Sequence, residues 1–586
     1  MMKNYLLLLL IVLALNEQVV LSQSFFHKSH KANSWVRHQF KLLTQDEKIA
    51  QLMVIRAHSN LGTEHFNQVS QLIKKYNIGS LCFFQGGPIR QALLTNYYQS
   101  IAKTPLMISI DAEWGLGMRL DSVINFPRQL MLGATTDPQL IYNLGIAVGK
   151  QCKRMGINVN YAPVVDINNN PENPVINDRS FGEDKYKVAS FGVAYMKGMQ
   201  DMNIMACAKH FPGHGDVSVD SHLDLPVINK TFKSLDTLEL YPFKKMIKAG
   251  VGSIMMAHLY IPAIDTTAHL ATSLSKNAVN NLLKNKLNFN GITITDGLEM
   301  KGISKFYPDG EASTQALIAG NDMLCLPSDI EGAINKVKEA IANDKLKWKQ
   351  INKRVKKVLL VKYNMGLNNY QPIDTANLLS NLNQSTALIK KQIATNSITC
   401  LKNNSALLPI NNSKKIAYLG IGLNADNVIT NQLKASYNCD NYFFTNKVTT
   451  ARLKETIEPS VGVLKKDTSK SNDSVTDLIK TLESKKYDII IVGVHNYSRR
   501  PASNYGLSDS AISLLNKLQQ NPSCVLLFFG NPYAIRYACN AATLFACYED
   551  DEAVQQVALD ILMGKLSAKG KLPVTVCNDL KYGSGL

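Results

Sequence analysis

The chain has 586 residues, of which 45% are hydrophobic and 19% charged, a composition typical of globular proteins that excludes disorder over most of the length. The length predicts roughly two to four domains. The net charge of +18 comes from scattered lysines. No basic run alternates with aromatic residues as grooves for nucleic acid require, so we expect no nucleic-acid partner.

The first residues have the pattern of an export signal. Lys3 gives a positive start, and residues 6–15 form an apolar run. Ser22 is a small residue before a predicted cleavage at Gln23. The run is shorter than the ~20 apolar residues of a membrane-spanning helix, and no later stretch reaches that length, so no integral membrane span is expected. We therefore expect residues 1–22 to be a signal peptide and the mature protein to be periplasmic or secreted.

The ten cysteines permit disulfides in an exported protein, but the sequence leaves the pairing open. Four of them lie in apolar, strand-like runs, where a buried thiol is the simpler interpretation: Cys82, Cys207, Cys325 and Cys524. No C-x-x-C motif is present to indicate a zinc ribbon or a thioredoxin-like site.

Short apolar runs alternate with amphipathic stretches over the first two thirds of the chain. This alternation predicts parallel strands covered by helices, as in a (β/α)8 TIM-type barrel over residues 23–367. The predicted strands are 52–56, 79–84, 105–111, 159–167, 205–211, 253–259, 291–297 and 322–327. The predicted helices include 64–76, 139–155, 186–202, 233–249 and 276–287.

A polar stretch then predicts a linker over residues 368–395. Beyond it, residues 396–586 alternate again and predict a second α/β sandwich domain with an open, mostly parallel sheet. Its expected strands are 415–421, 488–494, 524–530 and 543–548, and its expected helices are 508–519 and 552–563.

Polar residues stand at the ends of the predicted barrel strands. Barrel enzymes build their sites at the carboxyl ends of the strands, so this placement indicates catalysis. The residues are Asp111, Asp166, Lys209, His210, His258 and Asp296.

The segment Lys209-His-Phe-Pro-Gly-His-Gly-Asp216, followed by Asp220-Ser-His222, is the most unusual of the chain. It permits three interpretations. It is a polar surface loop, a metal site, or an acid–base pair in which Asp220 orients His222 and favours its protonated form. The side chains available to a metal are His210, His214, Asp216, Asp220 and His222, but their spacing matches no compact ligand motif.

Asp296 ends an apolar strand and is followed by Gly297. This position suits an exposed nucleophile at the mouth of a barrel. It equally suits the N-cap of a following helix, so the motif alone leaves both open.

These segments resemble glycoside hydrolase family 3, and specifically its β-N-acetylglucosaminidase branch. The resemblance rests on the two blocks just described and on Ile110-Asp-Ala-Glu113, Asn160-Tyr-Ala-Pro-Val-Val-Asp166, Arg179-Ser-Phe-Gly182 and Met256-Ala-His258. The second domain contributes Leu407-Leu-Pro-Ile410 and Gly570-Lys-Leu-Pro573. One departure is that many branch members have Glu-Gly-Gly-Arg where this chain has Glu113-Trp114-Gly115-Leu116.

The resemblance implies a retaining, exo-acting β-N-acetylhexosaminidase without metal or cofactor. Asp296 would be the nucleophile and His222 the acid/base, assisted by Asp220. Terminal N-acetylglucosamine of peptidoglycan or chitin-like fragments would be bound by Asp111, Arg119, Arg179, Lys209 and His210. A phosphorylase using the same site and a sugar-binding module without activity remain alternatives, and the sequence does not determine the oligomeric state.

Overall fold

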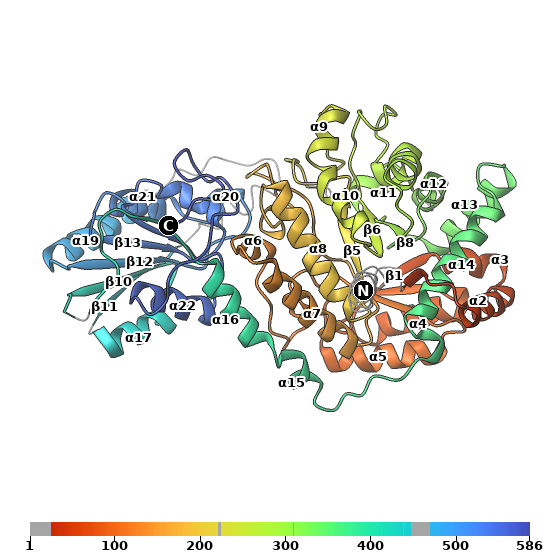
Figure 1. The fold of residues 1–586 in the computed structure, drawn as a ribbon, viewed down its shortest axis with the longest axis horizontal. Helices are drawn as coiled ribbons and strands as arrows, with labels where there is room; N and C mark the ends of the chain where they lie inside the picture. The colour runs from red at the N-terminus through yellow and green to blue at the C-terminus, as the bar shows by residue number, and fades with distance from the viewer. Residues whose placement is uncertain (1–24, 221–223, 309, 412, 438, 447–468) are drawn as a thin grey trace, which may run out of the picture. The chain divides into compact units, whose positions relative to one another are not determined.

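The computed structural model describes residues 25–220, 224–308, 310–411, 413–437, 439–446 and 469–586 (Figure 1). The predicted signal peptide, residues 1–22, and the predicted acid/base His222 lie outside the described residues. The chain forms two compact units. The first comprises Met1–Phe126, Pro138–Ile167 and Lys185–Thr386, and the second Pro127–Asp137, Asn168–Asp184 and Ala387–Leu586. Two segments of the N-terminal half therefore belong to the second unit.

The first unit is an eight-stranded parallel barrel, as the sequence predicts. Its strands follow the order β7-β6-β5-β4-β3-β2-β1-β8, and a bridge between Ile294 and Met323 joins β7 to β8. The strands are β1 Met53–Ala57, β2 Ser80–Phe83, β3 Met107–Ile110, β4 Val159–Asn160, β5 Met205–Phe211, β6 Ser253–Met256, β7 Ile292–Thr295 and β8 Leu324–Cys325.

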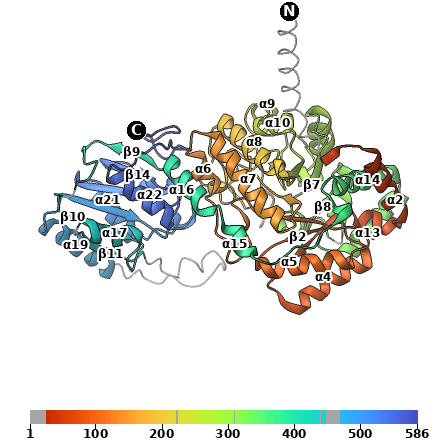
Figure 2. The ribbon, with the colours of Figure 1, turned by 60° about the horizontal axis from the view of Figure 1, so that its bottom comes forward.

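Helices surround these strands (Figures 1 and 2). The longer ones are α2 His30–Leu42, α4 Gly62–Tyr76, α5 Pro88–Ile101, α7 Pro138–Arg154, α8 Lys185–Asp201, α10 Leu240–Lys248, α12 Glu311–Ala319, α13 Ile330–Ala342, α14 Trp348–Asn364 and the π-helix η5 Asn277–Lys286. The shorter ones are α3 Gln45–Ala50, η2 Leu116–Met118, α9 Phe232–Thr237, η4 Thr272–Leu274, α11 Lys301–Ser304, η6 Leu367–Asn369 and α15 Leu378–Asn383.

The barrel strands are buried on both faces, which explains their near-continuous apolar sequences. Several strands are shorter than predicted, and β4 differs most. The sequence predicts a strand over 159–167, but β4 ends at Asn160. Pro163 follows it and has no backbone N–H to donate to a neighbouring strand. Pairing resumes only as an isolated bridge between Val164 and Lys209.

The stretch predicted as a linker contains α15 and the start of α16, Thr386–Ser397. Its first part is fastened to α7. Arg154 donates to the carbonyl oxygens of Asp374 (2.6 Å) and Ala376 (2.8 Å), and the Gln151 amide donates to that of Leu382 (2.8 Å). No helix in the described part of the chain is long and apolar enough to cross a membrane.

The second unit contains a six-stranded sheet with the order β11-β10-β12-β13-β14-β9, in which only β9 is antiparallel to its neighbour. This confirms the mostly parallel sheet expected from the sequence. The strands are β9 Thr399–Asn403, β10 Ile416–Ile421, β11 Asp440–Phe444, β12 Ile489–Val494, β13 Cys524–Phe528 and β14 Thr543–Ala546. Its helices are α6 Gln129–Gly133, η3 Asn177–Arg179, α16, α17 Val428–Tyr437, α19 Ser469–Ser484, α20 Ala502–Tyr505, α21 Asp509–Leu518, η7 Pro532–Tyr537 and α22 Glu552–Leu562.

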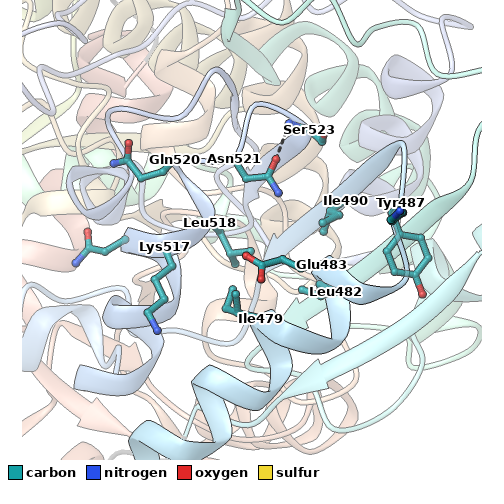
Figure 3. A pocket seen from close by; sticks show the side chains of 12 residues that line it. Ile479, Leu482, Glu483, Tyr487, Ile490, Lys517, Leu518, Gln520, Asn521 and Ser523 are labelled. Atoms are coloured by element: carbon teal, nitrogen blue, oxygen red, sulfur yellow. Dashed lines mark hydrogen bonds between the residues drawn. The ribbon is translucent and has the colours of Figure 1, made fainter.

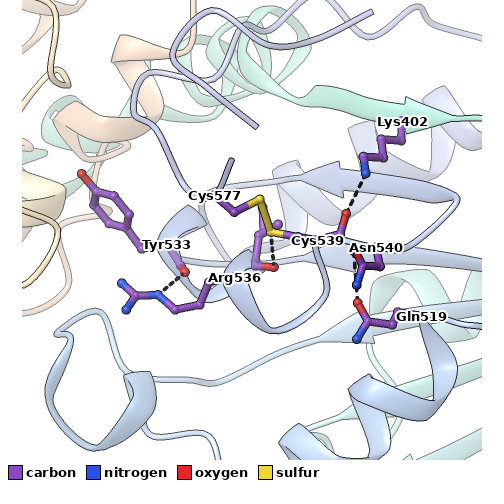
Figure 4. The surroundings of a disulfide bond; sticks show 8 residues. Lys402, Gln519, Tyr533, Arg536, Cys539, Asn540 and Cys577 are labelled. Atoms are coloured by element: carbon purple, nitrogen blue, oxygen red, sulfur yellow. Dashed lines mark hydrogen bonds between the residues drawn. A yellow bond between two sulfur atoms is a disulfide. The ribbon is translucent and has the colours of Figure 1, made fainter. Parts of the chain in front are cut away.

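One disulfide, between Cys539 and Cys577, joins the end of η7 to the C-terminal segment (Figure 4). The adjacent backbone is also held, because Lys402 donates to the carbonyl oxygen of Cys539 (2.7 Å) and the Gln519 side chain accepts from the N–H of Asn540 (3.1 Å). The other eight cysteines are free and buried, and they include the four predicted to be buried thiols.

Candidate functional site

A buried ion-pair cluster lies at the carboxyl ends of β3 and β5. The Nζ atom of Lys209 is 2.8 Å from Asp111 Oδ1 and 2.8 Å from Glu113 Oε1, and the Lys209 side chain is only 3% exposed. Arg119 approaches Asp111 from the other side, with Nη2 2.9 Å from Oδ2. The structure thus brings together three of the predicted sugar-binding residues, Asp111, Arg119 and Lys209.

The charge of Asp111 is stabilised by these neighbours. Burial alone would raise the pKa of its carboxyl, but the positive charges of Lys209 and Arg119 outweigh burial and hold the pKa below its ordinary value. Asp111 is therefore an ionised acceptor at the barrel mouth. A carboxylate can accept hydrogen bonds from two neighbouring sugar hydroxyls, while Lys209 donates.

His210 and His214 share one buried partner, Asp166. His210 Nδ1 lies 2.7 Å from Asp166 Oδ2, and the N–H of His214 donates to Oδ1 (2.7 Å). Burial opposes the charge of Asp166, but His210 and the other donors lower its pKa below the ordinary value. Burial lowers the pKa of His214 to about 4. Asp166 thus fixes the orientation of the His210 ring through its Nδ1 atom.

Asp296 follows β7 and is partly exposed. Its backbone N–H donates to the carbonyl oxygen of Met256 (2.9 Å), and its Oδ1 accepts from the N–H of Gly297 (2.8 Å). The N-cap alternative is wrong, because the next helix, α11, begins at Lys301 and is preceded by Met300 as its N-cap.

Gly297 is held by His258, which follows β6. His258 is fully buried, with Nε2 3.0 Å from the carbonyl oxygen of Gly297 and Nδ1 2.7 Å from the hydroxyl of Ser273. His258 therefore holds the backbone directly after Asp296 in position. The contacts described for His258 are structural and do not indicate that it binds a substrate.

Charged groups in β5 and directly after β3 and β7 all act on one buried thiol inside the barrel. Burial raises the pKa of the Cys207 thiol to about 12, and the charges of Lys209, Asp111 and Asp296 all act on that thiol as well. Side chains at the ends of three strands, up to 185 positions apart in the sequence, therefore surround the same part of the core. Active sites of barrel enzymes are built from residues at the carboxyl ends of several strands, and this arrangement agrees with that rule.

The loop after β5 is anchored at both ends. Lys230 Nζ lies 2.6 Å from Asp216 and 2.5 Å from Glu239. Apolar side chains of the loop pack with those of α9 and of the segment after β6 in one cluster: Val217, Ile228, Leu235, Ala257, Leu259, Ile261 and Ile264. Gly215 must lack a side chain, because a Cβ there would lie 1.7 Å from the carbonyl oxygen of Ile167. Asp220 is half-buried within this loop.

The described residues that one interpretation of this segment offered to a metal have other partners. Asp216 pairs with Lys230 and His210 pairs with Asp166. Within the described residues, no three His, Cys, Asp or Glu side chains form a group suited to a metal ion. The role of Asp220 with His222 remains a prediction, since His222 is not described.

Arg179 belongs to the second unit. Its Nη1 donates to the carbonyl oxygen of Val175 (3.2 Å), and the adjacent Asp178 faces Arg128 (3.4 Å) and Arg499 (3.5 Å). Its predicted contact with substrate therefore remains a prediction.

Sequence reasoning missed an aromatic and cationic cluster beside Arg119. The ring of Phe84 lies under the guanidinium groups of Arg56 (3.8 Å) and Arg119 (4.7 Å), and His58 stacks on it (5.5 Å). Arg56 also pairs with Glu299. Arg56 could have indicated this cluster in the sequence, because it is a charged residue inside the apolar run of β1. Trp114, at the departure from the family pattern, is half-buried, and its carbonyl oxygen accepts from the N–H of Phe126 (3.0 Å).

A separate pocket of about 560 Å³ lies in the second unit, between α19, α21 and the starts of β12 and β13 (Figure 3). Its walls combine the apolar Ile479, Leu482 and Leu518 with the charged Glu483 and Lys517. These residues offer no nucleophile paired with a base, so the barrel mouth is the candidate active site.

The chain is similar to glycosidases along most of its length. The glycosyl hydrolase family 3 N-terminal domain matches residues 44–361, and the C-terminal domain of the same family matches residues 398–584. Beta-hexosaminidase A of Pseudoalteromonas piscicida is 32% identical over 60% of this chain, and the match spans 64% of that relative, less than two thirds of its length. A beta-hexosaminidase of Thiobacillus denitrificans is 32% identical over 45% of this chain and 75% of its own length.

Among solved structures, a family 3 beta-N-acetylglucosaminidase from Paenibacillus sp. str. FPU-7 is similar to both units together. It is 26% identical, has a TM-score of 0.73, and the match covers 91% of this chain and 99% of that one.

Proposed function

Because the chain belongs to glycosyl hydrolase family 3, we propose that it is a retaining, exo-acting β-N-acetylglucosaminidase. The relatives named beta-hexosaminidase and the structural neighbour named beta-N-acetylglucosaminidase support this activity. The observation that carries the proposal is the position of Asp296, partly exposed at the end of β7 in the same barrel mouth as the Lys209–Asp111 pair.

In the first step, Asp296 acts as the nucleophile. One carboxylate oxygen attacks the anomeric carbon and forms a glycosyl ester, while the bond from that carbon to the leaving oxygen breaks. His222 in its protonated form gives its proton to the leaving oxygen, and Asp220 stabilises the imidazolium beforehand. The N–H of Gly297, 2.8 Å from Oδ1, keeps the carboxylate in place.

In the second step, the neutral His222 takes a proton from water. The resulting hydroxide attacks the anomeric carbon from the side that the leaving group vacated, and Asp296 departs as a carboxylate. Two inversions at the same carbon give net retention of the β configuration. His222 is again protonated, so the cycle closes without a metal or cofactor.

The sugar is held by the charged cluster in this proposal. Asp111 accepts from sugar hydroxyls, Lys209 and Arg119 donate to them, and the ring of His210 is presented by Asp166 at 2.7 Å. Arg179 is proposed as a further donor. Because these groups are buried in the barrel mouth, they suit a terminal sugar unit and hence an exo-acting enzyme.

We further propose that the substrates are peptidoglycan or chitin-like fragments and that the protein is exported. The signal-like sequence of residues 1–22 supports export, and so does the Cys539–Cys577 disulfide, because such bonds persist in oxidising compartments.

The test is hydrolysis of an aryl β-N-acetylglucosaminide by the wild type and by Asp296→Asn. The wild type should release the aryl alcohol, and the variant should lose at least about four orders of magnitude in kcat. An aryl β-glucoside assayed beside it should react far more slowly, and comparable turnover of both would refute the preference for the acetamido sugar. Sugar 1-phosphate formed only when phosphate is supplied would identify a phosphorylase instead. Activity that a chelator removes would identify a metal hydrolase.

A further inference from the structure

A large basic pocket lies at the end of the barrel opposite Asp296. It has a volume of about 1560 Å³, and its walls include Val251, Gly291 and Asp322, which precede β6, β7 and β8 respectively. Asp296 instead follows β7, so the pocket and the barrel mouth lie at opposite ends of the same strands. The pocket is therefore separate from the candidate active site.

The pocket carries a strong excess of positive charge. Seven of its residues are Lys or Arg, and Asp322 is the one acidic residue among the described side chains that line it. The cations come from α14, η5, α2 and the segment before α2. α2 packs against α14 (Figures 1 and 2). A concave surface with cations of this density concentrates anions.

Asp322 does not neutralise this charge. Its Oδ1 lies 3.1 Å from Lys284 Nζ and its Oδ2 lies 2.9 Å from Lys357 Nζ, so one carboxylate is shared by two ammonium groups. It also accepts hydrogen bonds from the N–H (3.0 Å) and hydroxyl (3.1 Å) of Thr293. Burial lowers the pKa of Lys284 to about 8, and the positive charges of Lys357 and Arg354 act in the same direction against the attraction of Asp322.

Arg354 provides a second, independent indication of a ligand. It lines the pocket, is only 8% exposed, and its Nη1 has no hydrogen-bond partner among the described residues. A buried donor without a partner costs free energy, and a bound acceptor would remove that cost. The planar guanidinium is suited to phosphate oxygens, and the lysines beside it act as point charges.

We propose that this pocket binds a ligand that carries several phosphate groups. The volume exceeds the roughly 300–1,000 Å³ of ordinary small-molecule pockets, so one phosphate would not fill it. Phe26, Val36, Phe289 and Leu360 add apolar surface to the walls, where the carbon chain of a phosphodiester oligomer can pack. Both a polyphosphate and a linear phosphodiester oligomer carry several phosphate groups, and one probe of each kind distinguishes between them.

The experiment is isothermal titration calorimetry on the full chain with inorganic tripolyphosphate and with a short oligo(glycerol phosphate), in about 0.15 M NaCl to screen diffuse attraction. Saturable binding of either probe supports the proposal. Tighter binding of the oligomer identifies a phosphodiester as the ligand, and tighter binding of tripolyphosphate identifies free polyphosphate. No saturable binding of either probe would overturn the proposal, and so would binding to phosphatidylglycerol vesicles without binding to the probes.

Two variants place the binding in the pocket. Lys28→Gln/Lys353→Gln removes two exposed cations of the pocket and should weaken binding about tenfold or more, because each charge-assisted hydrogen bond contributes substantially. The matched control, Lys74→Gln/Lys336→Gln, makes the same charge change outside the pocket, at an exposed position of α4 and a partly exposed position of α13, and should weaken binding less than about twofold. Equal losses in both double variants would contradict the assignment. Arg354→Gln should also weaken binding, and its melting temperature reports whether the fold is kept.

Discussion

The Nζ of Lys209 lies 2.8 Å from Oδ1 of Asp111, although the two residues are 98 positions apart. Lys209 lies in the second half of β5, and Asp111 directly follows β3. The pair therefore joins two strands that are separated by β4 in the sheet. The same ion pair therefore stabilises the barrel mouth and provides two of the side chains proposed to bind the sugar.

Replacing Lys209 by Met should damage both properties. The variant leaves the carboxylates of Asp111 and Glu113 buried without their shared cation, and breaking a buried pair in this way costs about 3–5 kcal/mol of unfolding free energy. The kcat/KM for an aryl β-N-acetylglucosaminide should fall by about two orders of magnitude or more. Denaturant unfolding and steady-state kinetics measure the two effects. Lys74→Met, at an exposed position, is the control.

The pH dependence of stability should reveal the ionised state of Asp111. Its pKa in the folded protein is below the ordinary value, so its ion pairs stabilise the fold at neutral pH, and this contribution is lost as pH falls through the lowered pKa. The melting temperature of Asp111→Asn should therefore lie below that of the wild type at neutral pH, and the gap should narrow below about pH 4. A gap that stays constant down to acid pH would contradict the assigned charge state.

Much of the fold follows from local sequence, and the reasons are physical. The runs that became β2, β3, β6 and β7 are buried on both faces, so they contain only apolar and small hydroxyl side chains, and a charged residue stands in or after the last part of a strand. That constraint made Asp111, Lys209 and Asp296 recognisable before their contacts were known.

Long-range contacts were not predictable in the same way. Glu113 was seen only as part of a motif, because its pairing with Lys209 depends on how β3 and β5 are placed. Residues 168–184 join the second unit through contacts such as Asn168 with Tyr533 (2.9 Å), which no local pattern encodes. The pairing of Cys539 with Cys577 likewise could not be predicted from the sequence, because it depends on how the fold brings the two residues together.

The importance of His222 should depend on the leaving group. His222→Ala should slow hydrolysis of substrates with poor leaving groups by about 10²–10⁴-fold, because general-acid catalysis contributes that much. A substrate with a very acidic phenol needs little protonation, so its glycosylation step should be far less affected. A series of aryl β-N-acetylglucosaminides tests this relationship. Equal losses across the series would argue against His222 as the acid.

Lys362 should impose a separate pH dependence on stability. It is fully buried, with only the side-chain oxygen of Gln51 near its Nζ (2.7 Å) among the described contacts, and burial lowers its pKa to about 7. Between about pH 7 and the ordinary pKa of 10.5, Lys362 is protonated in the unfolded chain but neutral in the folded protein. The free energy of unfolding should therefore rise with pH across that window.

Lys362→Met should abolish this rise. It should also stabilise the protein by about 1–3 kcal/mol below pH 7, because the folded wild type must there bury a charge. Melting curves from about pH 6 to pH 10 check both expectations. A variant that melts lower than the wild type across the range would contradict them.

The most direct test is mass spectrometry of the protein after reaction with a fluorinated N-acetylglucosaminyl fluoride. The ring fluorine slows both steps, and the fluoride leaving group speeds the first, so a glycosyl-enzyme accumulates. Peptide mapping should find the sugar on Asp296, and Asp296→Asn should remain unlabelled. A label on any other residue, or an Asn variant that turns over substrate at the wild-type rate, would contradict covalent catalysis by Asp296.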